Sequence, residues 1–90
     1  MTKKFIDLDV AEIKNAINRT GTASNLVIKD EVFIPEADIL ICEYKNTRVN
    51  IKVDLAYGAN IEPVGRLAET DVDEIKELIM KNIDLHRPET

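Results

Sequence analysis

The sequence predicts an α+β fold, a two-layer sandwich in which a helix, a three- or four-stranded antiparallel meander and a second helix follow one another. Two observations predict the helices and the sheet. Apolar residues recur at helical spacing near both ends of the chain. Between them, "RVNIKVDLAYG" (48–58) alternates apolar and polar residues, as a strand with one buried face does. Because each helix and the sheet has one apolar face, both helices are expected on one face of the sheet.

The first helix is predicted over residues 8–20, because four apolar residues recur at spacings of four, three and four: Ile6, Val10, Ile13 and Ile17. Asp9 and Glu12 have the spacing of a capping box, in which each acid binds an unpaired amide of the first turn. Leu8 and Ile13 occupy the two positions of a hydrophobic staple around that cap. Gly21 stands where the helix is expected to end.

Residues 24–57 are predicted to form the strands. "NLVI" and "EVFI" are one bent strand or two short ones, and Pro35 ends this segment or lies on an edge. A two-residue turn at 46–47 would pair Leu40 with Val53, although a longer turn would avoid pairing Lys45 with Arg48. That register predicts one buried face: Leu40, Cys42, Tyr44, Val49, Ile51, Val53 and Leu55.

Residues 58–69, "GANIEPVGRLAE", are predicted to be a long connection because they contain two glycines and a proline. The second helix is predicted over 70–84, with Thr70 as its N-cap. Its expected buried stripe is Val72, Ile75, Ile79 and Ile83, with Leu78 beside it. Ninety residues make a single domain, 1–90, with frayed ends at 1–5 and 86–90.

Composition argues against several function classes. The net charge is -5 and the basic residues are scattered, so nucleic-acid binding is not expected. A lone cysteine, Cys42, excludes an internal disulfide, and we expect it in the core. The start "MTKKFIDLDV" lacks the apolar run of a signal peptide, and the chain has no apolar stretch long enough for a membrane span. We therefore expect a cytoplasmic protein without membrane contact, and the frequent Ile, Lys and Asn favour a bacterial or phage source.

No catalytic, metal or cofactor site is predicted. The acids at 71, 73 and 74 are expected for capping and dipole reasons at a helix start. His86 follows the second helix, where positive charge is favoured. "GANIEPVG" lacks the lysine and spacing of a phosphate-binding loop. A long loop is a common place for binding residues, so Tyr57, Asn60 and Arg66 are candidate recognition residues.

The strand face turned away from the core carries the main functional hypothesis. In the expected register, Ile39 lies opposite Asp54 and Ile41 lies opposite Lys52, and Val27 or Phe33 joins them. A contiguous apolar patch on such a face indicates a partner surface. We therefore predict a partner-binding surface around Ile39, Ile41, Lys52 and Asp54.

The order helix–strands–helix resembles the double-stranded RNA-binding fold in element order only. That family's second helix begins with a basic cluster that contacts phosphates, whereas the matching segment here, "TDVDEIKE", is acidic. RNA binding is therefore not carried over. The first hypothesis is a non-enzymatic protein that acts through protein–protein contact, with a partner protein or with itself as a homodimer. The second is an acidic inhibitor or nucleic-acid mimic, and the third is a small enzyme. The acids of the second hypothesis are Asp71, Asp73, Glu74 and Glu77.

Overall fold

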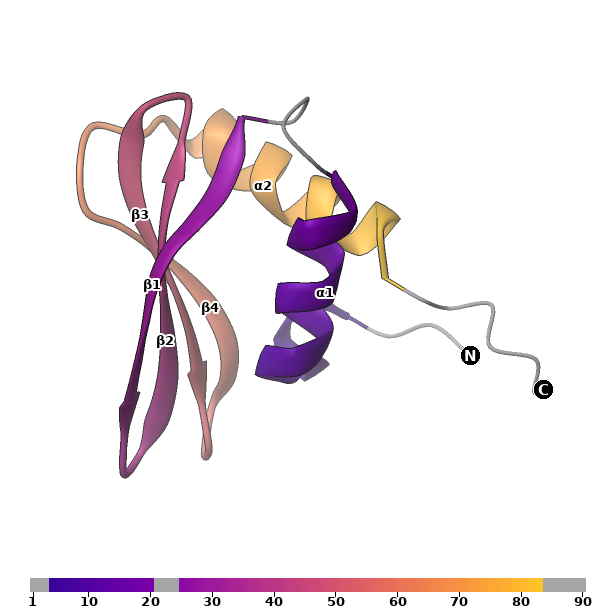
Figure 1. The fold of residues 1–90 in the computed structure, drawn as a ribbon, viewed down its shortest axis with the longest axis vertical. Coiled ribbons are helices and arrows are strands. Elements are labelled where there is room, and N and C mark those ends of the chain that lie inside the picture. The colour runs from indigo at the N-terminus through magenta and orange to yellow at the C-terminus, as the bar shows by residue number, and fades with distance from the viewer. Residues whose placement is uncertain (1–3, 21–24, 84–90) are drawn as a thin grey trace, which may run out of the picture.

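A computed structural model describes residues 4–20 and 25–83 and shows a two-layer α+β fold (Figure 1). Four antiparallel strands lie side by side in the order β1-β2-β3-β4, and both helices lie against one face of this sheet. The elements are η1 (Phe5–Asp7), α1 (Val10–Thr20), β1 (Leu26–Ile34), β2 (Ala37–Tyr44), β3 (Thr47–Asp54), β4 (Gly58–Pro63) and α2 (Glu69–Lys81). The predicted fold class is confirmed. Gly21 and His86 lie outside the described residues.

The start of α1 has the predicted cap. The Asp9 amide donates to Glu12 Oε1 at 3.0 Å, and the Glu12 amide donates to Asp9 Oδ1 at 2.8 Å. Leu8 and Ile13 are both buried, as the hydrophobic staple requires. The prediction that Ile6 belongs to the helical face is wrong. Ile6 lies in the separate turn η1, and 52 % of it is exposed.

The turn between β2 and β3 contains Lys45 and Asn46, one residue earlier than predicted. Both have positive φ, 51° and 66°, as a type I′ hairpin requires. Thr47 is β-branched and poorly suited to positive φ, and it pairs with Tyr44 as the first residue of β3 instead. The register therefore differs from the prediction by two residues. A shift of two keeps every side chain on its face, so the predicted core side of β2 and the start of β3 are correct.

The end of β3 corrects the prediction for Leu55. The strand stops at Asp54, whose Oδ1 accepts hydrogen bonds from the amides of Ala56 and Tyr57 at 2.7 and 3.0 Å. These bonds hold the pKa of the Asp54 carboxyl below its usual value. Leu55 consequently belongs to the turn and is 81 % exposed rather than buried.

The predicted connection 58–69 contains the fourth strand. β4 pairs with β3 along six residues, from Gly58 opposite Asp54 to Pro63 opposite Val49. Its Ala59 and Ile61 are buried at alternate positions, whereas glycine, asparagine and proline concealed this pattern in the sequence. Gly58 has a φ of 85°, and a Cβ there would lie 2.3 Å from the Ile6 carbonyl oxygen.

The segments flanking Lys29 form one strand with a bulge between Ile28 and Asp30. Of the two alternatives that the sequence left open, one bent strand or two short ones, the structure therefore shows the single strand.

Helix α2 begins at Glu69, with Ala68 rather than Thr70 as its N-cap. The Ala68 amide donates to Asp71 Oδ2 at 3.3 Å, so an acid at the third helical position supplies the cap contact.

The core lies between the inner face of the sheet and the two helices. The residues of the predicted stripe are buried as expected, with Ile75 and Ile79 buried on α2 and Val72 and Leu78 partly buried. The helix ends at Lys81, earlier than predicted, so Ile83 is buried just beyond it. Burial raises the pKa of the Cys42 thiol to about 12, which suits a small apolar core side chain better than a nucleophile. Phe5 also packs against the core. Among the described residues, no helix is long and apolar enough to cross a membrane.

Candidate interaction surface

The outer face of the sheet, turned away from the helices, is divided into an apolar half and a polar half. The pairing places eight residues of β1 and β2 on it: Val27, Asp30, Val32, Ile34, Ala37, Ile39, Ile41 and Glu43. β3 and β4 add Arg48, Asn50, Lys52, Asp54, Gly58, Asn60 and Glu62. Apolar side chains therefore predominate in the β1–β2 half, where Asp30 and Glu43 are the two charged residues, and charged or amide side chains predominate in the β3–β4 half.

Five apolar residues form what we call the β1–β2 strip: Val27, Val32, Ile34, Ile39 and Ile41. Val32 pairs directly with Ile39, and directly paired residues have Cβ atoms about 5 Å apart, so their side chains touch across the strands. Val27, Val32 and Ile34 are 38–39 % exposed, and Ile39 and Ile41 are half-buried among them. The strip is thus contiguous, which distinguishes it from isolated exposed apolar residues.

The predicted partner-binding residues all lie on this outer face, although their pairing differs from the prediction. Ile39 lies opposite Lys52 rather than Asp54, and Ile41 lies opposite Asn50 rather than Lys52, because the register is shifted. Val27 joins the strip. Phe33 does not, because it lies on the inner face near the end of β1.

Sequence reasoning missed Val32 and Ile34 as members of the strip. The bulge between Ile28 and Asp30 changes the alternation within β1. In a regular strand, residues an odd number of positions apart face opposite sides, so Val32 and Ile34 would face away from Val27. The bulge reverses the alternation and places all three on the outer face. The sequence did contain a signal for this face, because Val32 and Ile34 alternate with Phe33 within "EVFI".

Both edges of the sheet are protected against strand pairing. The bulge of β1 leaves Lys29 out of the pairing, and two acids, Asp30 and Glu31, follow it. Glu31 forms an ion pair at 3.0 Å with Lys14 of α1. Bulges and charges on an edge strand disfavour the addition of another strand. β4 is only six residues long and ends in a proline that lacks an amide donor. Both edges are therefore poor places for the addition of another strand.

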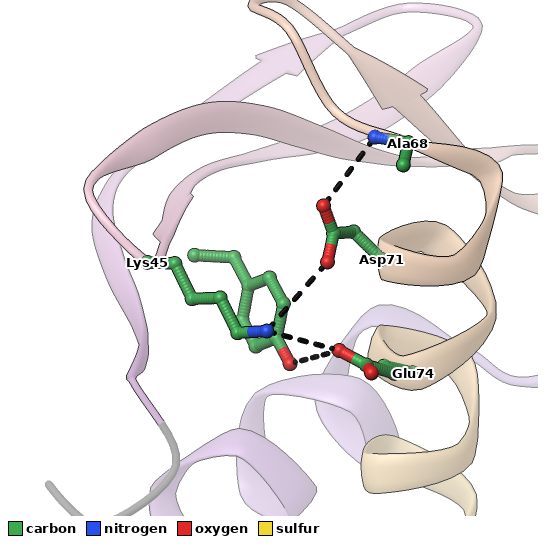
Figure 2. A network of polar contacts seen from close by, with 5 residues as sticks. Lys45, Ala68, Asp71 and Glu74 are labelled. Carbon is green, nitrogen blue, oxygen red and sulfur yellow. Dashed lines mark hydrogen bonds and ion pairs between the residues drawn. The ribbon is translucent and has the colours of Figure 1, made fainter.

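The acidic start of α2 is tied to the β2–β3 turn (Figure 2). Lys45 Nζ lies 3.3 Å from Glu74 Oε1 and 3.7 Å from Asp71 Oδ1, and the Tyr44 hydroxyl donates to Glu74 Oε1 at 2.8 Å. The bonds from Tyr44 and Lys45 hold the pKa of Glu74 below its usual value. The same contact with Glu74 raises the pKa of Lys45. Two of the four acids proposed for a basic partner, Asp71 and Glu74, thus contact Lys45 of their own chain. Glu74 is nevertheless exposed, as are Asp73 and Glu77.

The three candidate recognition residues do not converge. Tyr57 is 80 % exposed in the turn before β4, and Arg66 is exposed in the segment after β4, at the other end of that strand. Asn60 lies between them on the outer face, opposite Lys52. Tyr57 and Arg66 therefore lie at opposite ends of the sheet, with Asn60 on its outer face, so the three residues do not form one site.

A shallow depression of about 210 Å³ lies at one end of the strip, lined by Asn25, Val27, Glu43, Lys45 and Asn46. Within residues 4–20 and 25–83, no group of three or more His, Cys, Asp or Glu side chains is arranged to hold a metal ion.

Comparison of the chain with protein-family models, curated proteins and solved structures found no match.

Proposed function

We propose that this chain is a non-enzymatic interaction module that acts through protein–protein contact and associates with itself through the outer sheet face. One observation carries the proposal, namely the contiguous β1–β2 strip on a face that the helices do not cover. A sheet with one packed and one solvated face ordinarily alternates apolar and polar residues. On the outer side of β1 and β2, apolar residues outnumber the charged ones.

The size of the domain supports the same proposal. A chain of 90 residues buries only about two thirds of its unfolded surface, so covering a further apolar face would add stability that is large relative to the total. Each square ångström of apolar area removed from water contributes roughly 25 cal/mol before association costs. The proposal places the protein in the cytoplasm, where a lone thiol such as Cys42 stays reduced.

A pair of surface variants tests this proposal. Ile41→Lys introduces a charge into the strip, and Phe33→Lys introduces the same charge at a 64 % exposed apolar residue on the inner face, near the end of β1. Sedimentation equilibrium should show that Ile41→Lys remains a monomer while the wild type and Phe33→Lys associate. An Ile41→Lys variant with the wild-type mass at every concentration would overturn the proposed surface.

The acidic-mimic hypothesis makes a different prediction for the same protein. A complex that depends on exposed Asp73 and Glu77 should weaken steeply with added salt, because exposed charges more than about 8–10 Å apart are screened at 0.1–0.15 M salt. An interface made mainly by the apolar β1–β2 strip should depend on salt much less steeply. The salt dependence of association therefore separates the two hypotheses.

A further inference from the structure

From the layout of the outer face we infer how two copies meet, and this inference rests on the proposed self-association. We propose that the two sheets stack face to face about a two-fold axis that crosses the strands between the Ile39–Lys52 and Ile41–Asn50 pairs. Each strand then lies over the same strand of the partner copy in the opposite direction. Ile39 of one copy packs against Ile41 of the other, and the reverse contact follows by symmetry.

The available area decides against smaller contacts. Strands rise about 3.3 Å per residue and lie about 4.8 Å apart, so four strands paired over six residues offer about 400 Å² of projected face. A standard interface removes roughly 800 Å² of accessible surface per partner. Contact through β1 and β2 alone would cover half of this projected face. Two copies must therefore overlap over the whole outer face. The dimer is expected to be weak even then, because the face is small compared with a standard interface.

The division of the face into two halves selects the direction of the axis. An axis parallel to the strands and central to the sheet would lay β1 over β4, and would place Val32 near Asn60 of the partner copy. The apolar half of each copy would then face the polar half of the other. An axis that crosses the strands overlaps the whole face and keeps the β1–β2 strip on the β1–β2 strip. Sheets packed with nearly aligned strands are one of the two common sandwich geometries.

The polar residues of β3 agree with this axis. Arg48 and Asp54 stand at opposite ends of β3 on the outer face, so reversing one copy brings Arg48 of each over Asp54 of the other. Arg48 makes no side-chain ion pair within the part of the chain that the structure describes. The Asp54 hydrogen bonds to Ala56 and Tyr57 use Oδ1, which leaves Oδ2 for an arginine. The axis therefore creates two symmetric pairs of opposite charge.

The depression at the end of the strip agrees as well. The same reversal brings Ile34 of one copy over Val27 of the other, because these residues lie at opposite ends of β1. Val27 and Glu43 line the depression, whose volume of about 210 Å³ accommodates an isoleucine side chain. The operation thus brings Ile34 over Val27, Ile39 over Ile41 and Arg48 over Asp54 of the partner copy. Within the strip, Val32 is the residue that meets a charge, because it lies over Asp30 of the partner copy.

Complementary variants test this alignment. Ile39→Asp and Ile41→Lys each place one charge against an isoleucine of the partner copy, and each should weaken association at least tenfold. In an equimolar mixture, the aspartate introduced by Ile39→Asp in one copy would face the lysine introduced by Ile41→Lys in the other, so a heterodimer should form. The matched control mixes Ile39→Asp with Val27→Lys, whose charges do not face each other, and should remain monomeric. Circular dichroism establishes that each variant is folded.

The outcomes are separable by analytical ultracentrifugation with one variant labelled. A wild type that stays monomeric up to millimolar concentration would overturn the proposed self-association and this alignment together, and would leave the face to a different protein. A wild type that dimerises while the charge mixture does not would overturn only the alignment. Mixing Ile39→Cys with Ile41→Cys and adding a short bis-maleimide gives a second readout. The expected hybrid cross-link supports the alignment, and its absence in a dimerising protein refutes it.

Discussion

Leu40 and Ile41 are neighbours on β2 that face opposite sides of the sheet, and they offer a sharp test of the two-layer arrangement. Leu40 is 0 % exposed in the core, opposite Ile51, whereas Ile41 is half-buried on the outer face. Leu40→Ala should lower the free energy of unfolding by about 2–5 kcal/mol, because it removes buried methyl groups and leaves a cavity. Ile41→Ala in the monomer should cost about 1 kcal/mol, because water can fill the space that it leaves.

The two losses differ in what they mean for a chain of this size. A domain of 90 residues has a free energy of unfolding of about 5–13 kcal/mol, so Leu40→Ala removes a large share of it. Self-association adds stability that grows with protein concentration. The loss caused by Ile41→Ala should therefore increase with concentration, whereas the loss caused by Leu40→Ala should be nearly constant.

Urea unfolding followed by circular dichroism at two protein concentrations, a hundredfold apart, measures both effects. The wild-type midpoint should rise with concentration, and the Ile41→Ala midpoint should rise much less. Equal losses for Ile41→Ala and Leu40→Ala at every concentration would refute the reasoning, because they would mean that the outer face is covered within a single copy.

Three further predictions concern the fold. Gly58→Ala should lower the free energy of unfolding by about 1–3 kcal/mol in urea titrations, because φ is 85° and a Cβ would meet the Ile6 backbone. Cys42, with a pKa of about 12, should react with a thiol reagent only after unfolding, and rapid labelling of the native protein would contradict its burial. Glu74 has a lowered pKa, so its contribution should be complete above its unfolded pKa of about 4.5 and lost as the pH falls through the folded value. Glu74→Gln should flatten that acid dependence of stability.

Matched variants control these measurements. Gly65→Ala would bring a Cβ to 2.9 Å from a Thr47 methyl group that can move, and its φ is not positive, so it should cost less than Gly58→Ala. Glu77→Gln removes an exposed charge on the same helix as Glu74, away from Lys45. A Glu77→Gln variant that changes the acid dependence as much as Glu74→Gln would contradict the role given to the network.

The two-layer fold was predictable because periodicity survives local errors. The turn was predicted one residue too late, yet Leu40, Cys42 and Val49 were assigned to the correct face. A two-residue change in register preserves the alternation of a strand, whereas a one-residue change would have exposed the core. The cap of α1 was predictable because Asp9 and Glu12 interact within one turn.

Features that depend on distant residues were not predictable. β4 contains glycine, asparagine and proline, and only its pairing with β3 makes it a strand. Tyr44 and Lys45 are 30 and 29 residues from Glu74 in the sequence, so their network exists only after folding. Because of that network, Asp71 and Glu74 at the start of α2 contact residues of the same chain, which the acidic sequence by itself did not indicate.

The candidate surface was predicted in part for the same reason. Ile39 and Ile41 were found because their strand alternates regularly from Ala37 to Tyr44. Val32 and Ile34 were not, because the bulge of β1 decides their face and the sequence leaves its position open. The strip is formed by residues of β1 and β2, and the sequence predicted its β2 residues but only Val27 of β1.

A dilution series followed by methyl NMR would test the central claim most directly. If the outer sheet face is a self-association surface, the isoleucine methyl signals of Ile34, Ile39 and Ile41 should shift with protein concentration. The signals of Ile75 and Ile79, which are buried on α2, should stay constant and serve as internal references. Concentration-independent signals for Ile34, Ile39 and Ile41 would contradict the account, and so would shifts confined to exposed Ile6 in η1.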